Sequence, residues 1–176
     1  MIWIGAEPPQ AASQREALLD RAFGPARFAK TAERLREGRL PAEELSFAAL
    51  ESTAHGDMLV GTLRFWHVRL GEHCDGLLLG PVAVGEPWRG TGLGGRIIRR
   101  GLATARALGH RAVILVGDAP YYQRFGFSAA PASRLILPGP VDRHRFLALE
   151  LSPGAMATAE GPVRASGEPV DRRRAA

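Results

Sequence analysis

The stretch Arg89-Gly90-Thr91-Gly92-Leu93-Gly94-Gly95 decides the expected fold. An apolar run over residues 77–84 leads into it, and an amphipathic helix is predicted to leave from it. Glycines at alternate positions leave backbone N–H groups uncovered by side chains. The first N–H groups of a helix also attract anions, because they lack intrahelical partners and the helix dipole is positive there. The stretch therefore predicts a phosphate-binding loop.

Length and composition indicate one ordinary domain. The chain has 176 residues, enough to bury about two-thirds of its unfolded surface without metals or disulfides. Its only cysteine is Cys74, so no intramolecular disulfide can form. Residues 1–7 lack the basic start and long apolar stretch of a signal peptide, and no apolar run approaches the roughly 20 residues that span a bilayer. We expect a cytoplasmic protein with no membrane partner.

The net charge of +5 raises the question of nucleic-acid binding. All but one of the 23 basic residues are arginine, which is typical of a genome-wide codon bias. Acidic residues are interleaved with them, and the longest basic run is Arg172-Arg173-Arg174. We therefore expect no nucleic-acid partner.

The period of the apolar residues predicts an order of elements. They are a strand at 2–4, helices at 10–23 and 28–37, an antiparallel hairpin of 45–51 and 58–68, a buried strand at 77–84, a helix at 93–108, a strand at 112–116, a short helix at 120–125, and strands at 127–129, 135–137 and 146–151. The connection through residues 93–111 predicts a parallel crossover. From Ser152 the composition shifts to Ala, Gly and Pro, so residues 152–176 are predicted to be a largely disordered extension that follows a domain of residues 1–151.

One alternative for the glycine loop is a dinucleotide site. Residues 90–95 match G-x-G-x-x-G, and Asp118 ends the next predicted strand, where a ribose-binding acid is expected. The first glycine of that fingerprint directly follows its strand, whereas residues 85–89 intervene here, and Pro87 cannot continue a central strand. Too little chain follows Asp118 for the remaining units of such a domain. An NAD-binding protein is therefore a remote alternative.

Read from Arg89, the loop has the form R-x-x-G-x-G and resembles motif A of the GNAT superfamily of N-acetyltransferases. Residues 79–84 resemble the fourth strand of that family, and Glu86-Pro87-Trp88 resembles the loop before the motif. The run Tyr121-Tyr122-Gln123-Arg124-Phe125-Gly126-Phe127 is similar to the family's F-Y-x-x-x-G-F signature. The resemblance covers residues 1–151 and extends to a bacterial branch of predicted, largely uncharacterised members.

The resemblance implies a fold, a reaction and a cosubstrate. The fold is α/β of the mixed α+β kind, with six to seven mostly antiparallel strands, about four helices, and a splay between the fourth and fifth strands. The reaction is direct acetyl transfer from acetyl-CoA to an amine in a ternary complex. Pantetheine would insert along Val82, Ala83 and Val84, and a strand N–H there would hold the oxyanion. The pyrophosphate would lie on Arg89, Gly90, Thr91, Gly92, Leu93, Gly94 and Gly95. A homodimer is a candidate assembly, because dimers are common in the family.

Tyr122 matches the family's general acid, which protonates the departing CoA thiolate, and a phenol of pKa about 10 suits that role. Tyr121 is expected to be core or a wall of the CoA channel. The general base stays open. Residues 77–79 are all leucine where some members carry a glutamate, so the sequence leaves two routes: water-mediated deprotonation or binding of a neutral amine. Weaker candidates for the base lie elsewhere, and they are His67, Glu72, His73, Asp75 and Asp118.

Other side chains give weaker signals. Cys74 is expected to be a small buried side chain. The five histidines have no metal-ligand spacing, so no metal is predicted. Arg96, Arg99 and Arg100 are candidates for the CoA 3′-phosphate or a solvated helix face. The acceptor, a small-molecule or protein amine, is expected near residues 24–41 and 69–76. A non-catalytic acyl-CoA-binding module of the same fold is the main alternative function.

Overall fold

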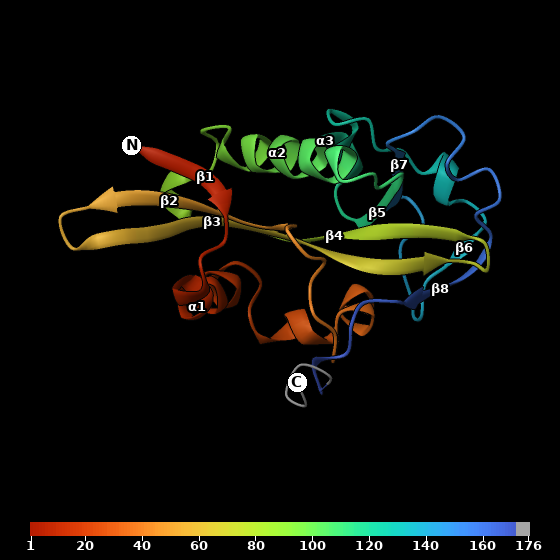
Figure 1. Cartoon of the computed structure of the whole chain (residues 1–176), viewed down its shortest axis with the longest axis horizontal. Helices are drawn as coiled ribbons and strands as arrows, with labels where there is room; N and C mark the ends of the chain where they lie inside the picture. Colours follow the sequence, from red (N-terminus) through yellow and green to blue (C-terminus); the bar gives the residue numbers. More distant parts are fainter. Residues whose placement is uncertain (172–176) are drawn as a thin grey trace.

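The computed structural model describes residues 1–171 and contains one mixed sheet with helices on both faces (Figure 1). Its strands are β1 Ile2–Ala6, β2 Ser46–Thr53, β3 Gly56–Leu70, β4 Cys74–Val84, β5 Ala112–Val116, β6 Leu135–Ile136, β7 Phe146–Glu150 and β8 Gly161–Ala165. The α-helices are α1 Ala12–Phe23, α2 Leu93–Ala107 and α3 Ala119–Gln123. Short 3-10 turns are η1 Pro9–Ala11, η2 Pro25–Ala29, η3 Thr31–Leu35, η4 Glu86–Trp88 and η5 Ala130–Ala132.

The main path of the sheet runs β1-β2-β3-β4-β5-β7. Neighbours on this path are antiparallel except β4 and β5, which are parallel and joined through α2. The predicted parallel crossover and the mostly antiparallel sheet are therefore confirmed. Among residues 1–171 the sheet has eight strands rather than six to seven, because β8 pairs with β3 and β6.

The sheet opens between β4 and β5. The two strands pair only at Leu77 with Val113 and at Leu78 with Ile114, although both continue beyond these residues. On the other edge of β4 the register with β3 shifts, so that Gly80 and Pro81 lie between the pairs that flank the shift. The indole N–H of Trp66 donates to the Gly80 carbonyl oxygen at 2.6 Å and fixes this bulge. The bulge and the open edge together leave the second half of β4 without a neighbour on the β5 side.

Two layers cover the sheet. α2 and α3 lie on one face, whereas α1, η2 and η3 lie on the other (Figure 1). The largest core cluster joins α2 to the sheet through residues such as Leu93, Ile97 and Phe65. A smaller cluster joins α1 to the opposite face through Leu18 and Leu19. In residues 1–171 no helix is both long and apolar enough to cross a membrane.

Gly101 allows α2 to lie close to β3. A Cβ atom at this position would lie 2.7 Å from Leu63 Cδ2 and 2.7 Å from Phe65 Cε2, inside van der Waals contact. We expect Gly101→Ala to lower the free energy of unfolding by about 1–3 kcal/mol, because overpacking outweighs the better helix propensity of alanine. Urea unfolding measures this change. Ala103→Gly makes the reverse exchange at an exposed position of the same helix and measures the difference in helix propensity between alanine and glycine. A net stabilisation by Gly101→Ala would contradict the close packing.

Two predicted elements differ from the structure. The helix predicted at 28–37 is two 3-10 turns, η2 and η3, separated by Lys30 in an extended conformation (φ −67°, ψ 143°). The extended backbone at Lys30 interrupts the segment, so one continuous helix does not form. The strand predicted at 127–129 is a single bridge between Ser128 and Ala148.

The C-terminal stretch also differs from its predicted disorder. Val163, Arg164 and Ala165 of β8 pair with the end of β3, on the edge that β2 leaves free. Met156 and Ala159 are buried with Val163 in the same core cluster, and the Leu40 N–H donates to the Glu168 carbonyl at 2.8 Å. Up to residue 171 the extension is therefore part of the sheet and its support. The remainder of that prediction, residues 172–176, lies outside the described residues, and the domain boundary at residue 151 stays a prediction.

Candidate functional site: two cavities along β4

The glycine loop follows β4 through η4 and forms the N-terminus of α2. Gly90 and Gly92 have positive φ values of 77° and 82°, which glycine adopts at little cost. The first backbone bond of the helix runs from the Arg96 N–H to the Gly92 carbonyl at 3.1 Å, and no side chain caps the helix. Among the described residues, the N–H groups of Leu93 and Gly94 therefore remain available to an anion, as does that of Gly95.

Arg89 is tied to the backbone on both sides of the loop. Its N–H donates to the Glu86 carbonyl at 3.1 Å, and its side-chain Nε donates to the Val84 carbonyl at 3.3 Å. These two donors are thus used within the chain, and they close the connection between β4 and α2. Arg89 also lines the cavity at the glycine loop, next to the free N–H groups of residues 93–95.

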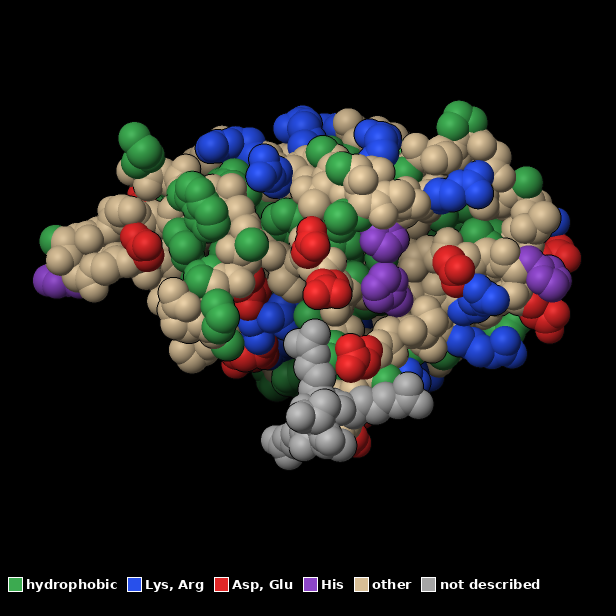
Figure 2. Space-filling view, in the orientation of Figure 1, with side chains coloured by type: hydrophobic (Ala, Val, Ile, Leu, Met, Phe, Trp, Pro, Cys, Tyr) green, Lys and Arg blue, Asp and Glu red, His purple; other side chains and the backbone are tan. Residues whose placement is uncertain are grey.

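A cavity of about 360 Å³ lies against this loop. Arg99 of α2 and Arg124, just after α3, line it together with the glycines and Tyr121. The Arg124 guanidinium lies 4.3 Å from the Tyr121 ring centroid, and that of Arg99 lies 5.3 Å from the Phe125 ring. Arg99 was one of three candidates on α2, whose exposed arginines line one edge of the molecule (Figure 2). Arg124 was missed, because only the docking of α3 brings it to the loop.

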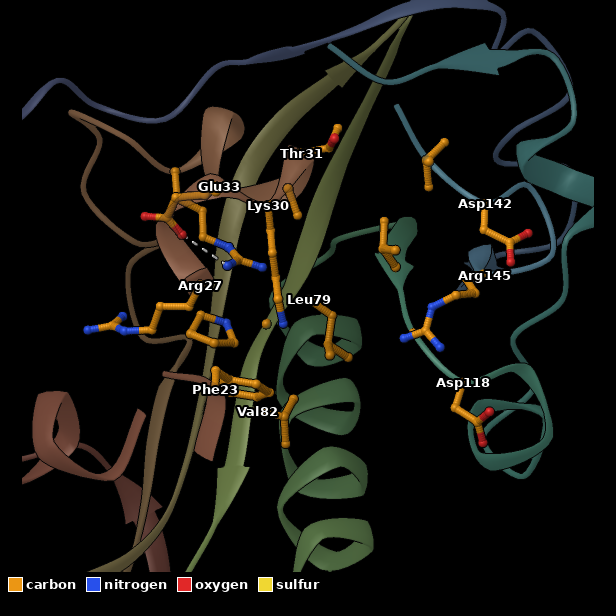
Figure 3. A pocket seen from close by; sticks show the side chains of 18 of the residues that line it. Phe23, Arg27, Lys30, Thr31, Glu33, Leu79, Val82, Asp118, Asp142 and Arg145 are labelled. Carbon is orange, nitrogen blue, oxygen red and sulfur yellow. Dashed lines mark hydrogen bonds and ion pairs between the residues drawn. The ribbon is translucent and has the colours of Figure 1, made fainter. Parts of the chain in front are cut away.

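A second cavity, of about 590 Å³, lies further back along β4 (Figure 3). Its floor includes Leu79, Gly80, Pro81 and Val82 of β4, and Tyr122 lines it from α3. The two cavities therefore use successive residues of the same two elements: Val82 and Tyr122 in this one, Val84 and Tyr121 in the loop cavity. The unpaired edge of β4 runs between them. Ala83 lies between these two residues of β4 and is itself buried.

Tyr122 is largely enclosed by aromatic rings and by backbone. Its ring centroid lies 5.9 Å from that of Phe127 and 5.1 Å from that of Tyr121. A Cβ atom on Gly117 would lie 2.4 Å from the Tyr122 ring, so only glycine permits this approach. Burial raises the pKa of the Tyr122 phenol to about 12, with a further increase from Tyr121 and a decrease from the positive charge of Arg145. Within residues 1–171 its hydroxyl forms no hydrogen bond, so it is a proton donor without a protein partner.

The weaker base candidates separate in the structure. Asp118 lines the cavity of Tyr122, and its carboxylate accepts a hydrogen bond from the Tyr121 N–H at 3.3 Å, as an N-cap of α3. His67, His73 and Asp75 line a different cavity, of about 570 Å³, at the β3–β4 turn. Glu72 belongs to the same turn and is highly exposed. None of these four lines the Tyr122 cavity.

Cys74 is buried, and burial raises the pKa of its thiol, which is typical of an unreactive side chain.

Sequence reasoning missed several charged residues of the Tyr122 cavity. Glu33 and Arg36 come from the η3 segment, and Asp142 and Arg145 come from the loop before β7. Of the two segments predicted to surround the acceptor, residues 24–41 contribute to this cavity and residues 69–76 do not. No local pattern marks the loop before β7, because its contribution depends on β7 pairing with β5.

Comparison with known proteins identifies relatives of this arrangement. Residues 13–127 match the family model described as Acetyltransferase (GNAT) family. An uncharacterized N-acetyltransferase of Escherichia coli (strain K12), YhbS, is 33% identical over 128 residues, which are 72% of this chain and 74% of that protein.

Solved structures give the same result. The crystal structure of Escherichia coli YhbS in complex with CoA has a TM-score of 0.77 and 31% identity, and the match covers 94% of this chain and 89% of that one. A GNAT family acetyltransferase from Brucella melitensis in complex with acetyl-CoA has a TM-score of 0.62 and 31% identity, with coverage of 87% and 90%.

Proposed function

The chain belongs to the GNAT family of acetyltransferases, and we propose that it moves the acetyl group of acetyl-CoA directly to an amine, with Tyr122 as the general acid. The acceptor is a small-molecule or protein amine, and the transfer takes place in a ternary complex. The observation that carries the proposal is the succession of the glycine-loop cavity and the Tyr122 cavity along the unpaired edge of β4.

In the proposed complex, acetyl-CoA lies along this edge. Its pyrophosphate lies on the loop from Gly90 to Gly95, where the helix N-terminus and the nearby Arg99 and Arg124 offset the negative charge. The pantetheine amides pair with the backbone of Val82, Ala83 and Val84, as an added strand would. Because Pro81 has no N–H, Val82 is the first residue beyond the bulge that can donate to the oxyanion.

The reaction follows from this placement. The neutral amine nitrogen attacks the thioester carbonyl carbon and forms the C–N bond. The C–S bond then breaks, and the sulfur takes the proton of the Tyr122 hydroxyl. The nitrogen loses one proton, which restores the tyrosine through water. All atoms and charges balance without a further reactant.

The raised pKa of Tyr122 bears on this step. A phenol of pKa about 12 is a weaker acid than free tyrosine, but the thiol product is formed in the same enclosed site, where burial also raises the pKa of a thiol. The positive charge of Arg145 stabilises the transient phenolate. Tyr122 is thus matched to a leaving group that is desolvated together with it.

The β4 strand bears on the alternative function. Leu77, Leu78 and Leu79 are buried, and residues 79–84 carry no carboxylate, so no base comes from this half of the strand. A non-catalytic acyl-CoA-binding module would also have this feature. In the proposed enzyme, the amine either binds in its neutral form or loses its proton to water.

Release of free CoA thiol from acetyl-CoA in the presence of an amine panel tests the proposal. We expect amine-dependent thiol release with matching formation of the acetylated amine by mass spectrometry. Tight CoA binding in calorimetry without turnover on any amine would favour the binding module. Protection against heat by NAD and not by CoA would favour the dinucleotide alternative.

A further inference from the structure

Several cations line the Tyr122 cavity. Lys30, Arg36 and Arg145 line it from three separate places: the link between η2 and η3, the end of η3, and the loop before β7. Figure 3 shows Lys30 and Arg145 reaching toward the cavity from opposite walls. The volume of about 590 Å³ suits a small molecule.

These cations have few partners in the chain. In the described residues neither Lys30 nor Arg145 forms an ion pair, and the Lys30 ammonium lies 4.5 Å from the Phe23 ring centroid. Arg36 donates one hydrogen bond, to Glu33 at 3.3 Å, and its Nε is buried without a partner. Burial lowers the pKa of this guanidinium, which marks it as poorly compensated. These three side chains therefore present N–H donors that the chain does not use.

The acidic side chains of the cavity are already engaged. Glu33 accepts from Arg36, the Asp118 carboxylate accepts from the Tyr121 N–H, and the Asp142 carboxylate accepts from the His144 N–H at 2.9 Å. A fourth cation of the lining, Arg27, is also engaged, because it pairs with Glu16 and Asp20 outside the cavity. The cations left free are thus Lys30 and Arg145, with Arg36 only partly satisfied.

The phosphates of CoA do not account for these cations. The donors next to the glycine loop are backbone N–H groups together with Arg89, Arg99 and Arg124, and none of them lines the Tyr122 cavity. Lys30, Arg36 and Arg145 line the Tyr122 cavity and not the loop cavity, so in the proposed complex they are available to an acceptor.

We propose that the acceptor is an amine that also carries a carboxylate, as a free amino acid does, and that Lys30, Arg36 and Arg145 bind this carboxylate. The inference rests on the proposed function and names its acceptor class. Guanidinium groups recognise carboxylates through directed, charge-assisted hydrogen bonds.

Matched acceptors test this proposal. Each L-amino acid of a panel is compared with its α-amide and with the corresponding amine that lacks the carboxyl group, by CoA thiol release. We expect kcat/KM for the preferred amino acid to exceed that of both partners at least about tenfold, the value of one hydrogen bond to a charged group. Equal or better turnover of the amide or the decarboxylated amine would overturn the acceptor class and leave acetyl transfer standing.

Variants add a measurement that does not depend on the folded fraction. In Lys30→Gln and Arg145→Gln the ratio of amino acid to amide kcat/KM should fall toward one, because only the amino acid loses a contact to its carboxylate. A loss of folded protein lowers both values equally and leaves the ratio unchanged. Arg164→Gln, an exposed arginine of β8 outside both cavities, is the matched control and should keep the parent ratio. An unchanged ratio in both cavity variants would overturn the assigned roles.

Calorimetry separates this inference from the transfer reaction. CoA-saturated protein is titrated with the same amino acids and amides. Carboxylate-dependent binding without turnover would support the acceptor site and overturn the proposed enzyme. Absence of binding by every amino acid, together with absence of turnover, would overturn the acceptor site as well.

Discussion

Tyr122→Phe is expected to lower kcat for acetyl transfer by about 100-fold or more, because proton transfer by a positioned side chain contributes that much to a rate. The change removes one oxygen and leaves the ring against Gly117 and Phe127 in place. The Kd for acetyl-CoA should therefore stay near that of the parent. Thiol-release assays give kcat, and calorimetry gives the Kd.

Tyr121→Phe is the matched comparison. It removes the same atom one residue away, where the Tyr121 hydroxyl faces Gly94 in the loop cavity. We expect this variant to change acetyl-CoA binding more than kcat. If the two variants had equal kcat values, or if Tyr122→Phe kept the parent kcat, Tyr122 would not be the acid.

The pKa of Tyr122 gives the same prediction a pH dependence. Tyr122 should stay protonated through pH 11, so kcat should not fall in the alkaline range for want of this acid. The chain has two tyrosines, so subtracting the tyrosinate absorbance of Tyr122→Phe from that of the parent isolates the Tyr122 titration, with a midpoint near 12. Its pKa is raised in the fold above the ordinary value of about 10. The neutral phenol therefore stabilises the fold fully below pH 10, and this contribution is lost as the pH rises toward 12.

Gly94→Val is expected to weaken acetyl-CoA binding at least about 100-fold. A Cβ atom there would lie 3.0 Å from the Tyr121 hydroxyl and 3.5 Å from Val84 Cγ2, so a valine fills the gap between α3 and the end of β4. It also shields the first-turn N–H groups. A hydrogen bond to a charged group contributes about 1.5–3 kcal/mol, and the loss of two such bonds corresponds to this factor or more.

Ala103→Val introduces the same side chain at an exposed position of the same helix that does not line the loop cavity, and it is the matched control. Calorimetric titration with CoA gives the Kd of both variants, and thermal unfolding shows that both are folded. We expect a loss of affinity in Gly94→Val alone. Parent-like affinity in Gly94→Val would remove the glycine loop from the phosphate site.

Local sequence determined most of the elements because their physical causes are local. The glycines at 90 and 92 permit the positive φ values of the loop before the helix begins at residue 93. The apolar run over residues 77–84 specified most of β4. The two segments of β-forming residues at 45–51 and 58–68, with a turn between them, specified the hairpin. The loop and the Tyr122 signature, both of them short and continuous in the chain, were therefore sufficient to identify the GNAT family.

Only the tertiary structure decided which distant segments meet. β8 has five residues and a weak pattern, and it is stabilised by pairing with β3 rather than by its own propensity. Lys30, Arg36 and Arg145 surround one cavity because the two 3-10 turns replace a helix on one wall and β7 pairs with β5 on the other. The proposed phosphate loop can thus be predicted from sequence, because its donors are backbone groups within seven consecutive residues. The proposed acceptor site cannot, because its side chains are far apart in the chain and share a cavity only in the folded structure.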